Sequence, residues 1–352
     1  MTFRVVQWGT GNVGRIALRA IIENPELELV GVVVHNPTKV GVDAGELCGV
    51  DPVGVPATDD PAAALASSPD VVCYTAAADR RPHEAVDEIC LALTAGANVV
   101  STSVVSLLHR NSAEPAVLAQ LDAACQAGGT SCFTSGNDPG FSTEYLPLVL
   151  TGALERLDFL RVMEVSSYAS YDKPEILFDM VGFGKPPDYV PPLLMPGVLT
   201  RLGGGSIHGI AAGLGVTLDR IDEVHERWNT DVDLSVNGSV IPAGTMAALK
   251  FELQGIVDGK PLIAVGHCNR MHDDAAPDWP RSTGKAYDIT VEGSPTIRLN
   301  VDMVGADGDH NTAGLTITAM RVLHAIPAVC RAAPGVLGAL DVGLLTGHGV
   351  VR

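Results

Sequence analysis

The hydrophobic pattern of residues 1–140 alternates between short β-rich runs and segments with helical spacing. Apolar side chains recur at helical intervals over Val13–Asn24, Pro82–Gly96 and Ala113–Gly128. The β-rich runs around them are Phe3–Trp8, Leu27–His35, Asp70–Thr75, Asn98–Ser101 and Thr130–Thr134. Such alternation is typical of a parallel sheet covered by helices, so it predicts a doubly wound α/β domain over residues 1–140.

The pattern changes after Pro139 and Gly140. A stretch rich in proline and glycine, around residues 182–215, is followed by strand-like runs at Met246–Val257, Lys260–Arg270, Ala286–Glu292 and Ile297–Val304. These runs predict a second, α+β domain over residues 141–310 with a largely antiparallel sheet. Residues 311–352 begin with a helix that Pro327 interrupts, and we expect them to pack back on the first domain.

The first strand leads directly into a glycine-rich turn, Gly9-Thr10-Gly11-Asn12-Val13-Gly14, and then into a helix. In this context Gly9 permits the tight turn, Gly11 lets the backbone approach a pyrophosphate, and Gly14 lets the helix and strand pack closely. The helix N-terminus adds free N–H groups and the positive end of its dipole. The turn therefore predicts a Rossmann domain that binds a dinucleotide.

The residues after the second strand bear on the choice of dinucleotide. An Asp or Glu there binds the ribose hydroxyls of NAD and repels the 2′-phosphate of NADP. This chain reads His35-Asn36-Pro37-Thr38-Lys39, without an acid, and Asn36, Thr38 and Lys39 can donate to a phosphate. The sequence favours NADP, with NAD possible; the alternative is a solvated loop with one incidental lysine.

Small and polar residues follow three further strands. Ligands in open α/β sheets lie outside the carboxyl ends of the strands, so we expect these residues to contact the cofactor. They are Thr75 and Ala76, Ser101 and Thr102, and Asn137 and Pro139. We expect Asn137 above all to contact the cofactor or the substrate, although an Asx-turn that closes the loop explains it equally well.

Several segments of the chain resemble the family of 2,4-diaminopentanoate dehydrogenase and native amine dehydrogenases. They are Gln7–Gly14, Asp43–Leu47, Asn98–Thr102, Gly136–Phe141, Ala276–Pro280, Asn311–Leu315 and Ala325–Val329. The first domain is similar to that of dihydrodipicolinate reductase. The resemblance implies a substrate domain whose open sheet pairs across a homodimer. It also implies reversible NAD(P)-linked reductive amination of a ketone or aldehyde, with ammonia as co-substrate.

The chain departs from these relatives in two places. It lacks the H-H-x-x-K stretch of true dihydrodipicolinate reductases, so that activity is disfavoured. The amine dehydrogenases carry a catalytic Glu just after the strand that ends in Ser101 and Thr102, where this chain has Val104 and Val105. Two alternatives therefore stay open: a carbonyl or imine reductase without ammonia chemistry, and a catalytically silent NADP-binding regulator.

The candidate proton carriers lie in the second domain. Glu164 follows the apolar run Phe159–Met163, and burial there would raise its pKa toward a useful value. His208 lies in a glycine-rich stretch that we expect to be a flexible lid or substrate loop, and His267 ends an apolar strand. Either histidine is equally well explained as a structural imidazole. Tyr168, Tyr171 and Asp172 are weaker candidates.

Composition narrows the ligands further. There are 23 Lys+Arg against 41 Asp+Glu, a net charge of −18, so we expect no nucleic acid partner. His267, Cys268 and His272 lack zinc-type spacing, so we expect no metal. An apolar cluster without a basic pair indicates a small, mostly apolar substrate, or ordinary core; it comprises Met180, Val181, Phe183, Leu193, Leu194 and Met195.

The sequence also carries expectations about location. No apolar stretch approaches the roughly 20 residues of a membrane helix, and the chain enters a strand at once, so we expect no signal peptide. The seven cysteines are scattered, which favours reduced thiols over disulfides. We therefore expect a cytoplasmic protein without a membrane partner.

Overall fold

The computed structural model describes residues 2–79, 81–169, 174–236, 238–281 and 286–351. The chain forms two compact units. Unit 1 comprises residues 1–141 and 314–352, and unit 2 comprises residues 142–313. The C-terminal residues thus belong to the same unit as the N-terminal ones, and the second division falls inside α8 (His310–Leu323).

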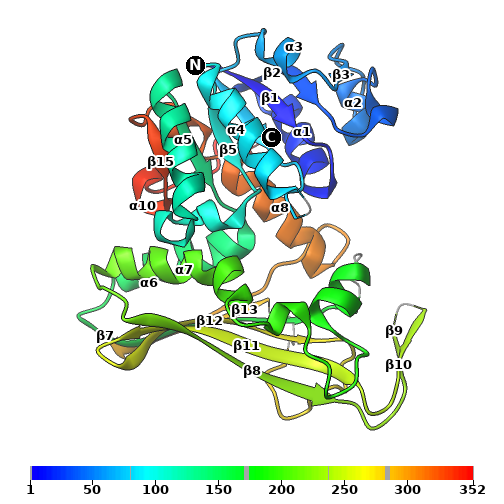
Figure 1. The fold of residues 1–352 in the computed structure, drawn as a ribbon, viewed down its shortest axis with the longest axis vertical. Coiled ribbons are helices and arrows are strands. Elements are labelled where there is room, and N and C mark those ends of the chain that lie inside the picture. The colour runs from blue at the N-terminus through cyan, green and yellow to red at the C-terminus, as the bar shows by residue number, and fades with distance from the viewer. Residues whose placement is uncertain (1, 80, 170–173, 237, 282–285, 352) are drawn as a thin grey trace. The chain divides into compact units, whose positions relative to one another are not determined.

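Unit 1 contains a seven-stranded sheet in the order β15-β6-β5-β4-β1-β2-β3 (Figure 1). All neighbouring strands are parallel. The strands are β1 (Phe3–Trp8), β2 (Leu27–Val33), β3 (Ala57–Thr58), β4 (Val71–Tyr74), β5 (Asn98–Ser101), β6 (Ser131–Thr134) and β15 (Gly335–Leu337). The predicted doubly wound parallel sheet is confirmed.

Helices cover both faces of this sheet. On one face, α4 (Pro82–Thr94) and α5 (Pro115–Gly128) bury their apolar side chains against β1, β4 and β5. On the other, α1 (Asn12–Glu23), α8 and α9 (Ile326–Val329) pack against β1, β4, β5 and β6. Shorter helices are α2 (Ala44–Cys48), α3 (Pro61–Leu65) and α10 (Ala339–Val342), with 3₁₀ turns η1 (Pro37–Lys39), η2 (Val105–Leu108) and η3 (Arg110–Ser112).

One described segment, His310–Val329, is long and apolar enough to cross a membrane by length and composition alone. Its mean hydropathy reaches 1.2 over an 18-residue window, so the expectation that no apolar stretch approaches this length is wrong. The physical reason lies in the core. Ala319, Val322, Ile326 and Val329 from this segment are fully buried against the sheet of unit 1, and core helices meet the same two criteria.

Unit 2 contains a six-stranded sheet in the order β14-β13-β7-β12-β11-β8. Only the neighbours β7 and β12 are parallel; the other pairs are antiparallel, which confirms the predicted second domain. The strands are β7 (Arg156–Ser167), β8 (Arg220–Asn229), β11 (Met246–Val257), β12 (Lys260–Arg270), β13 (Tyr287–Ser294) and β14 (Ile297–Val301). A separate hairpin consists of β9 (Leu234–Val236) and β10 (Ser239–Ile241).

The glycine-rich stretch of unit 2 is a helix, α7 (Val198–Leu214), so the expected flexible lid is wrong. Its glycines let the helix approach its neighbours. A Cβ at Gly203 would lie 2.8 Å from Leu253 Cδ1, and one at Gly209 would overlap the carboxylate of Glu144. Close packing therefore outweighs the poor helix propensity of glycine. Figure 1 shows α7 and α6 (Leu146–Thr151) along one side of the sheet.

Three irregular helical segments complete the described chain. They are η4 (Asn137–Tyr145), η5 (Glu175–Val181) and η6 (Pro192–Leu194). Most of the predicted apolar cluster lies in or near the last two. Phe183, Leu193 and Leu194 are buried, whereas the Met195 side chain is 52% exposed, so much of this cluster is core.

Candidate active-site residues

The glycine-rich turn has the backbone geometry that a dinucleotide requires. Gly9 has a φ of +94°, and a Cβ there would lie 2.7 Å from the backbone nitrogen of Ala76. A Cβ at Gly14 would overlap the carbonyl oxygen of Gly9. Any side chain at these two positions would separate the turn from the end of β4 or from α1. Their predicted roles in the tight turn and in close packing agree with this geometry.

Gly11 differs from both of them. No described heavy atom lies within 4 Å of the point where its Cβ would be. It is the N-cap of α1 without a side-chain cap, and the first turn of α1 contains no acid. The N–H groups at this helix end thus face open space beside a residue that has no side chain. Thr10, Gly11, Asn12 and Val13 therefore fit the diphosphate of a dinucleotide.

A buried glutamine supports this turn from behind. Gln7 Nε2 donates to the carbonyl oxygen of Gly9 and to Thr75 Oγ1, each at 2.8 Å, and the residue is fully buried. Thr75 Oγ1 also donates to the Gly9 carbonyl at 3.1 Å. The sequence analysis placed Thr75 at the cofactor site and assigned no role to Gln7. The position of Gln7 two residues before the first glycine is the signal that would have found it.

The predicted phosphate donors after β2 have different surroundings. Lys39 Nζ donates to the carbonyl oxygen of Thr10 at 2.8 Å, which places this ammonium at the glycine-rich turn. Asn36 instead caps η1, since its Oδ1 accepts from the backbone N–H of Thr38 at 3.0 Å. His35 lies 2.8 Å from Glu88 of α4. The fold thus brings the carboxylate of Glu88 to the end of β2. The residues that directly follow β2 in the sequence contain no acid, as expected, but an acid from α4 lies beside them.

The carboxyl ends of β5 and β6 have small polar side chains, as expected. Ser101 Oγ accepts from the backbone N–H of Ser103 at 2.9 Å, and Thr102 donates its N–H to Tyr74 of β4 at 3.1 Å. Asn137 is 5% exposed, and its backbone N–H donates to Thr318 Oγ1 at 3.1 Å. The peptide bond between Asp138 and Pro139 is cis. The cofactor contacts of these residues stay predictions.

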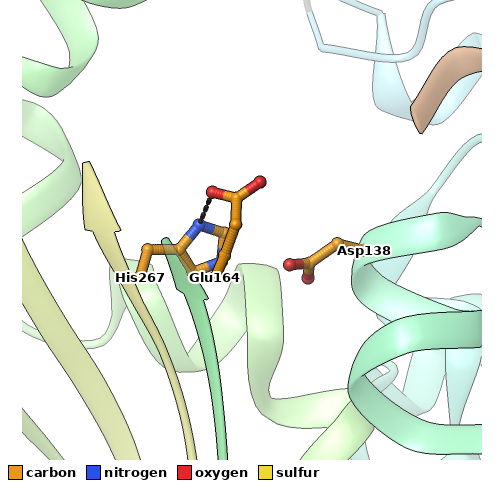
Figure 2. Close-up of side chains that lie close together, drawn as sticks. All are labelled: Asp138, Glu164 and His267. Carbon is orange, nitrogen blue, oxygen red and sulfur yellow. Dashed lines mark hydrogen bonds and ion pairs between the residues drawn. The ribbon is translucent and has the colours of Figure 1, made fainter. Parts of the chain in front are cut away.

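In unit 2 a polar cluster surrounds Glu164, which is 7% exposed on β7; of this cluster, Figure 2 draws Glu164 and His267. The Glu164 cluster comprises Glu164, Tyr168, His267, Asn269 and His310. His267, directly opposite on β12, approaches Glu164 Oε2 with Nδ1 at 2.9 Å. Asn269 Nδ2 donates to the same oxygen at 2.8 Å and Tyr168 OH at 3.2 Å. His310 Nε2 lies 3.5 Å from Oε1.

The sheet register explains why these side chains meet. Glu164 and His267 are paired across β7 and β12, and Asn269 follows His267 by two residues on the same face. Phe251 of β11 stacks on the His267 ring, with centroids 4.8 Å apart and planes at 15°. Tyr287 of β13, opposite Glu164, meets the His310 ring edge-on at 6.3 Å. Aromatic rings therefore hold both imidazoles.

The electrostatics differ from what the sequence indicated. Burial alone would raise the pKa of Glu164, but His267, His310 and Asn269 together hold this pKa well below the ordinary value of 4.5. The hydrogen bond to Glu164 raises the pKa of His310 above the ordinary 6.5. The expectation of a raised Glu164 pKa is therefore wrong. Glu164 is an ionised carboxylate at neutral pH, and the neighbouring imidazoles are the groups that can take up and release a proton.

Comparisons with known proteins cover most of the chain. The model of the 2,4-diaminopentanoate dehydrogenase C-terminal domain matches residues 141–348, and that of the dihydrodipicolinate reductase N-terminus matches residues 3–104. An amine dehydrogenase of Streptomyces virginiae is 42% identical over 345 residues, 96% of each chain. The chain belongs to the 2,4-diaminopentanoate dehydrogenase family. It is therefore an NAD(P)-dependent oxidoreductase of the amine dehydrogenase type.

More distant relatives agree with this membership. The 2,4-diaminopentanoate dehydrogenase of Acetoanaerobium sticklandii is 24% identical over 96% of this chain and 92% of its own. The structure of an amine dehydrogenase from Mycobacterium smegmatis superposes with a TM-score of 0.75 over 99% of this chain and 97% of that one, at 20% identity. This likeness shows the fold. The family model of dihydrodipicolinate reductase that matches this chain is that of the N-terminus, over residues 3–104.

The position at which the family resemblance places a catalytic Glu is apolar in this chain. Val104 has a φ of +56°, a left-handed conformation that a β-branched residue rarely adopts, and packs against the core between the sheet and α4–α5. Val105 begins η2. The acid that the family resemblance implies is therefore not supplied by this segment.

The remaining predicted proton carriers are less well placed. His208 lies on α7, not on the strands that carry the Glu164 cluster, and burial lowers its pKa. Tyr171 and Asp172 lie outside the described residues. Asn269 and His310 were missed by the sequence analysis. His310 directly precedes Asn311–Leu315, one of the segments that carry the family resemblance, and that adjacency is the signal that would have found it.

Proposed function

We propose that this protein catalyses the reversible reductive amination of a small, mostly apolar ketone or aldehyde, with NADP preferred and NAD usable. The name and 42% identity of the Streptomyces virginiae amine dehydrogenase support the reaction class. The observation that carries the proposal is the Glu164 cluster, in which a buried carboxylate is hydrogen-bonded to imidazole. Such a pair supplies the acid–base function that the family position at Val104 lacks.

The residues of unit 1 bind and orient the cofactor. The N–H groups around Gly11 and the N-terminus of α1 donate to the diphosphate, and Gln7 and Thr75 keep the turn in shape. When bound, the nicotinamide cofactor supplies or accepts the hydride. The turn itself has no titratable side chain, so it takes no part in proton transfer.

The residues of unit 2 move the proton. Because Glu164 is ionised, it can only accept, so His267 Nδ1 carries the proton of their hydrogen bond. This fixes the tautomer in which Nε2 accepts a proton from ammonium and later returns it to the departing hydroxyl. The carboxylate also stabilises the imidazolium that forms in between. General acid–base catalysis of this kind contributes about 10²- to 10⁴-fold to the rate.

A charge-neutral substitution tests this assignment. We expect Glu164→Gln to lower reductive amination at least about tenfold and to leave NADPH affinity intact, because hydride transfer needs only orientation. Glu252→Gln is the matched control: Glu252 is also buried in this sheet, but it pairs with Arg161 at 2.9 Å and belongs to a different row of the register. Full amination activity in Glu164→Gln would reject the assignment.

The same assay separates the alternative functions. Wild-type protein should consume NADPH with a carbonyl compound only when ammonia is present. Equal rates with and without ammonia would indicate a carbonyl reductase. Tight NADPH binding without turnover on any carbonyl compound would indicate a regulator. Val105→Glu, which restores an acid near the family position, should raise the rate of amination.

The preference for NADP rests on Lys39. Its ammonium lies at the glycine-rich turn, where the ribose of the adenosine half approaches the end of β2. Fluorescence titration should give tighter binding of NADPH than of NADH. Lys39→Ala should reduce that preference. Equal or weaker binding of NADPH by the wild type would reject it.

We further infer a cytoplasmic homodimer that pairs through the open face of the unit 2 sheet. This face, opposite α7, carries Arg161 and Glu226, which are 47% and 61% exposed. All seven cysteines are free, as in a reducing compartment. Light scattering should give twice the monomer mass, and cell fractionation should recover the protein with the cytosol. A monomeric mass would reject the dimer.

A further inference from the structure

A charged network lies at the carboxyl end of β2, outside the Glu164 cluster and the glycine-rich turn. The Glu88 network comprises His35, Tyr74, Arg81 and Glu88. Glu88 Oε2 accepts from Tyr74 OH at 2.6 Å and from Arg81 Nη2 at 2.7 Å, while Glu88 Oε1 lies 2.8 Å from His35 Nε2. Arg81 Nη2 also lies 2.9 Å from His35 Nε2. Three separate segments thus bring an acid and a guanidinium to one strand end.

The place of this network gives it a role in cofactor recognition. His35 follows β2 at the point where dinucleotide-binding sheets recognise the 2′-substituent of the adenosine ribose. Arg81 is the N-cap residue of α4, the helix that follows β4 in the chain, and β4 is the strand next to β1. The guanidinium therefore touches the side chain at the recognition position. No residue near His35 in sequence carries a comparable fork of donors.

Glu88 does not act here as the acid that selects NAD. Both of its oxygens are engaged, and its side chain is 19% exposed. Burial raises the pKa of Tyr74, so its hydroxyl stays protonated and keeps donating to Glu88. The charge of Arg81 balances that of the carboxylate. A phosphate at this strand end would therefore meet a compensated acid instead of a bare one.

We propose that Arg81 determines cofactor specificity by binding the 2′-phosphate of NADP, held in position by Glu88. The proposal rests on the NADP preference proposed above and adds a residue that the local sequence does not indicate. The side-chain contacts of Arg81 with the described residues all use Nη2, so Nη1 can donate a charge-assisted hydrogen bond to a phosphate while the Glu88 contact persists. The side chain is 29% exposed, which leaves it accessible to a ligand.

Two probes isolate the 2′-phosphate from redox chemistry: adenosine 2′,5′-bisphosphate and 5′-AMP, measured by calorimetry on the full chain. We expect the wild type to bind the bisphosphate more tightly. Arg81→Ala should weaken binding of the bisphosphate at least about tenfold, as loss of a hydrogen bond between charged groups does, and change 5′-AMP affinity less than about twofold. Arg81→Lys keeps the charge, but a single ammonium cannot hold Glu88 through one nitrogen and a phosphate through another, so this variant should lose part of the bisphosphate affinity and less than Arg81→Ala.

Arg110→Ala is the matched control, because Arg110 also forms a two-bond ion pair in unit 1, with Asp122, away from this network. It should leave both affinities unchanged. An equal loss of both ligands in Arg81→Ala would overturn the proposal, as would no loss of either. If Arg81→Ala does not fold, Arg81→Lys decides: unchanged bisphosphate affinity overturns the proposal. A wild type that does not prefer the bisphosphate rejects the NADP preference as well, whereas a preference that survives in Arg81→Ala rejects only the role of Arg81.

Discussion

The chain has two glycine-rich segments that look alike in sequence and differ in structure. Residues 9–14 form a turn at the end of β1, and Gly11 faces open space with no described heavy atom within 4 Å of its missing Cβ. Residues 203–213 lie in α7, where the space beside Gly209 is filled by Glu144 and that beside Gly213 by Leu148. In the turn the missing side chain leaves room for a ligand, and in the helix it leaves room for the protein itself.

This difference shows what glycine content does and does not indicate. In the turn, the glycines indicated a dinucleotide site because a strand precedes them and a helix follows them. In α7, the glycines recur with helical neighbours such as Ile207 and Ile210, which are fully buried. A stretch of glycines between apolar residues at helical spacing is therefore compatible with a tightly packed helix.

The largest effect that the comparison predicts is at Gly11. Gly11→Val should lower NADPH affinity at least about 100-fold, because the side chain fills the volume that the pyrophosphate needs. Its extended backbone (φ −77°) accepts valine, and the surroundings are open, so the melting temperature should change little. Fluorescence titration and circular dichroism measure the two. Unchanged affinity with an unchanged fold would mean that the turn is not the binding site.

The opposite outcome is expected in α7. Gly209→Ala should destabilise the protein by about 1–3 kcal/mol, since the added methyl group overlaps the buried Glu144 carboxylate and forces it to move. Cofactor affinity should be unchanged, because Gly209 belongs to unit 2. Chemical denaturation gives the free energy of unfolding. A variant as stable as the wild type would show that α7 is not closely packed at this point.

The glycine-rich turn and the Glu164 cluster also differ in how far the sequence predicts them. The strands β11 and β12 have the bounds that the apolar pattern predicted, and the glycine-rich turn was found because its residues are contiguous. The Glu164 cluster is assembled from β7, β12 and α8. Its partners depend on strand register, which no local pattern encodes. For the same reason the sequence predicted burial of Glu164 and named His267, but it did not predict that His267 and His310 pair with Glu164 and keep it ionised.

The dependence of stability on pH should also distinguish the Glu164 cluster from the glycine-rich turn. The lowered pKa of Glu164 contributes stability above about pH 4.5, which is lost as the pH falls through the folded value. The raised pKa of His310 contributes stability below about pH 6.5, which is lost as the pH rises through its higher folded value. Both contributions are complete between these two limits, so the melting temperature should be highest there.

Glu164→Gln removes both contributions and should flatten this profile, by about 1.4 kcal/mol for each unit of pKa shift that is lost. Glu252→Gln should keep the profile, since Glu252 pairs with Arg161 outside the cluster. Calorimetry between pH 4 and 9 gives the two curves. A Glu164→Gln curve parallel to that of the wild type would show that the cluster is not coupled to folding. Residues 9–14 have no titratable side chain, so Gly11→Val should leave the shape of the profile unchanged.

The smallest expected effect has the opposite sign to that of Gly209→Ala and comes from the same helix. A Cβ at Gly204 would lie 3.4 Å from Thr200 Cγ2 and 3.6 Å from Ile221 Cδ1, which are ordinary van der Waals distances. Gly204→Ala should therefore stabilise the protein by about 0.4–1 kcal/mol, because alanine restricts the unfolded chain without a clash in the folded one. Denaturation of both alanine variants under the same conditions measures the difference. If Gly204→Ala destabilises as much as Gly209→Ala, then α7 needs glycine for its backbone rather than for its neighbours, and the contrast between the two segments fails.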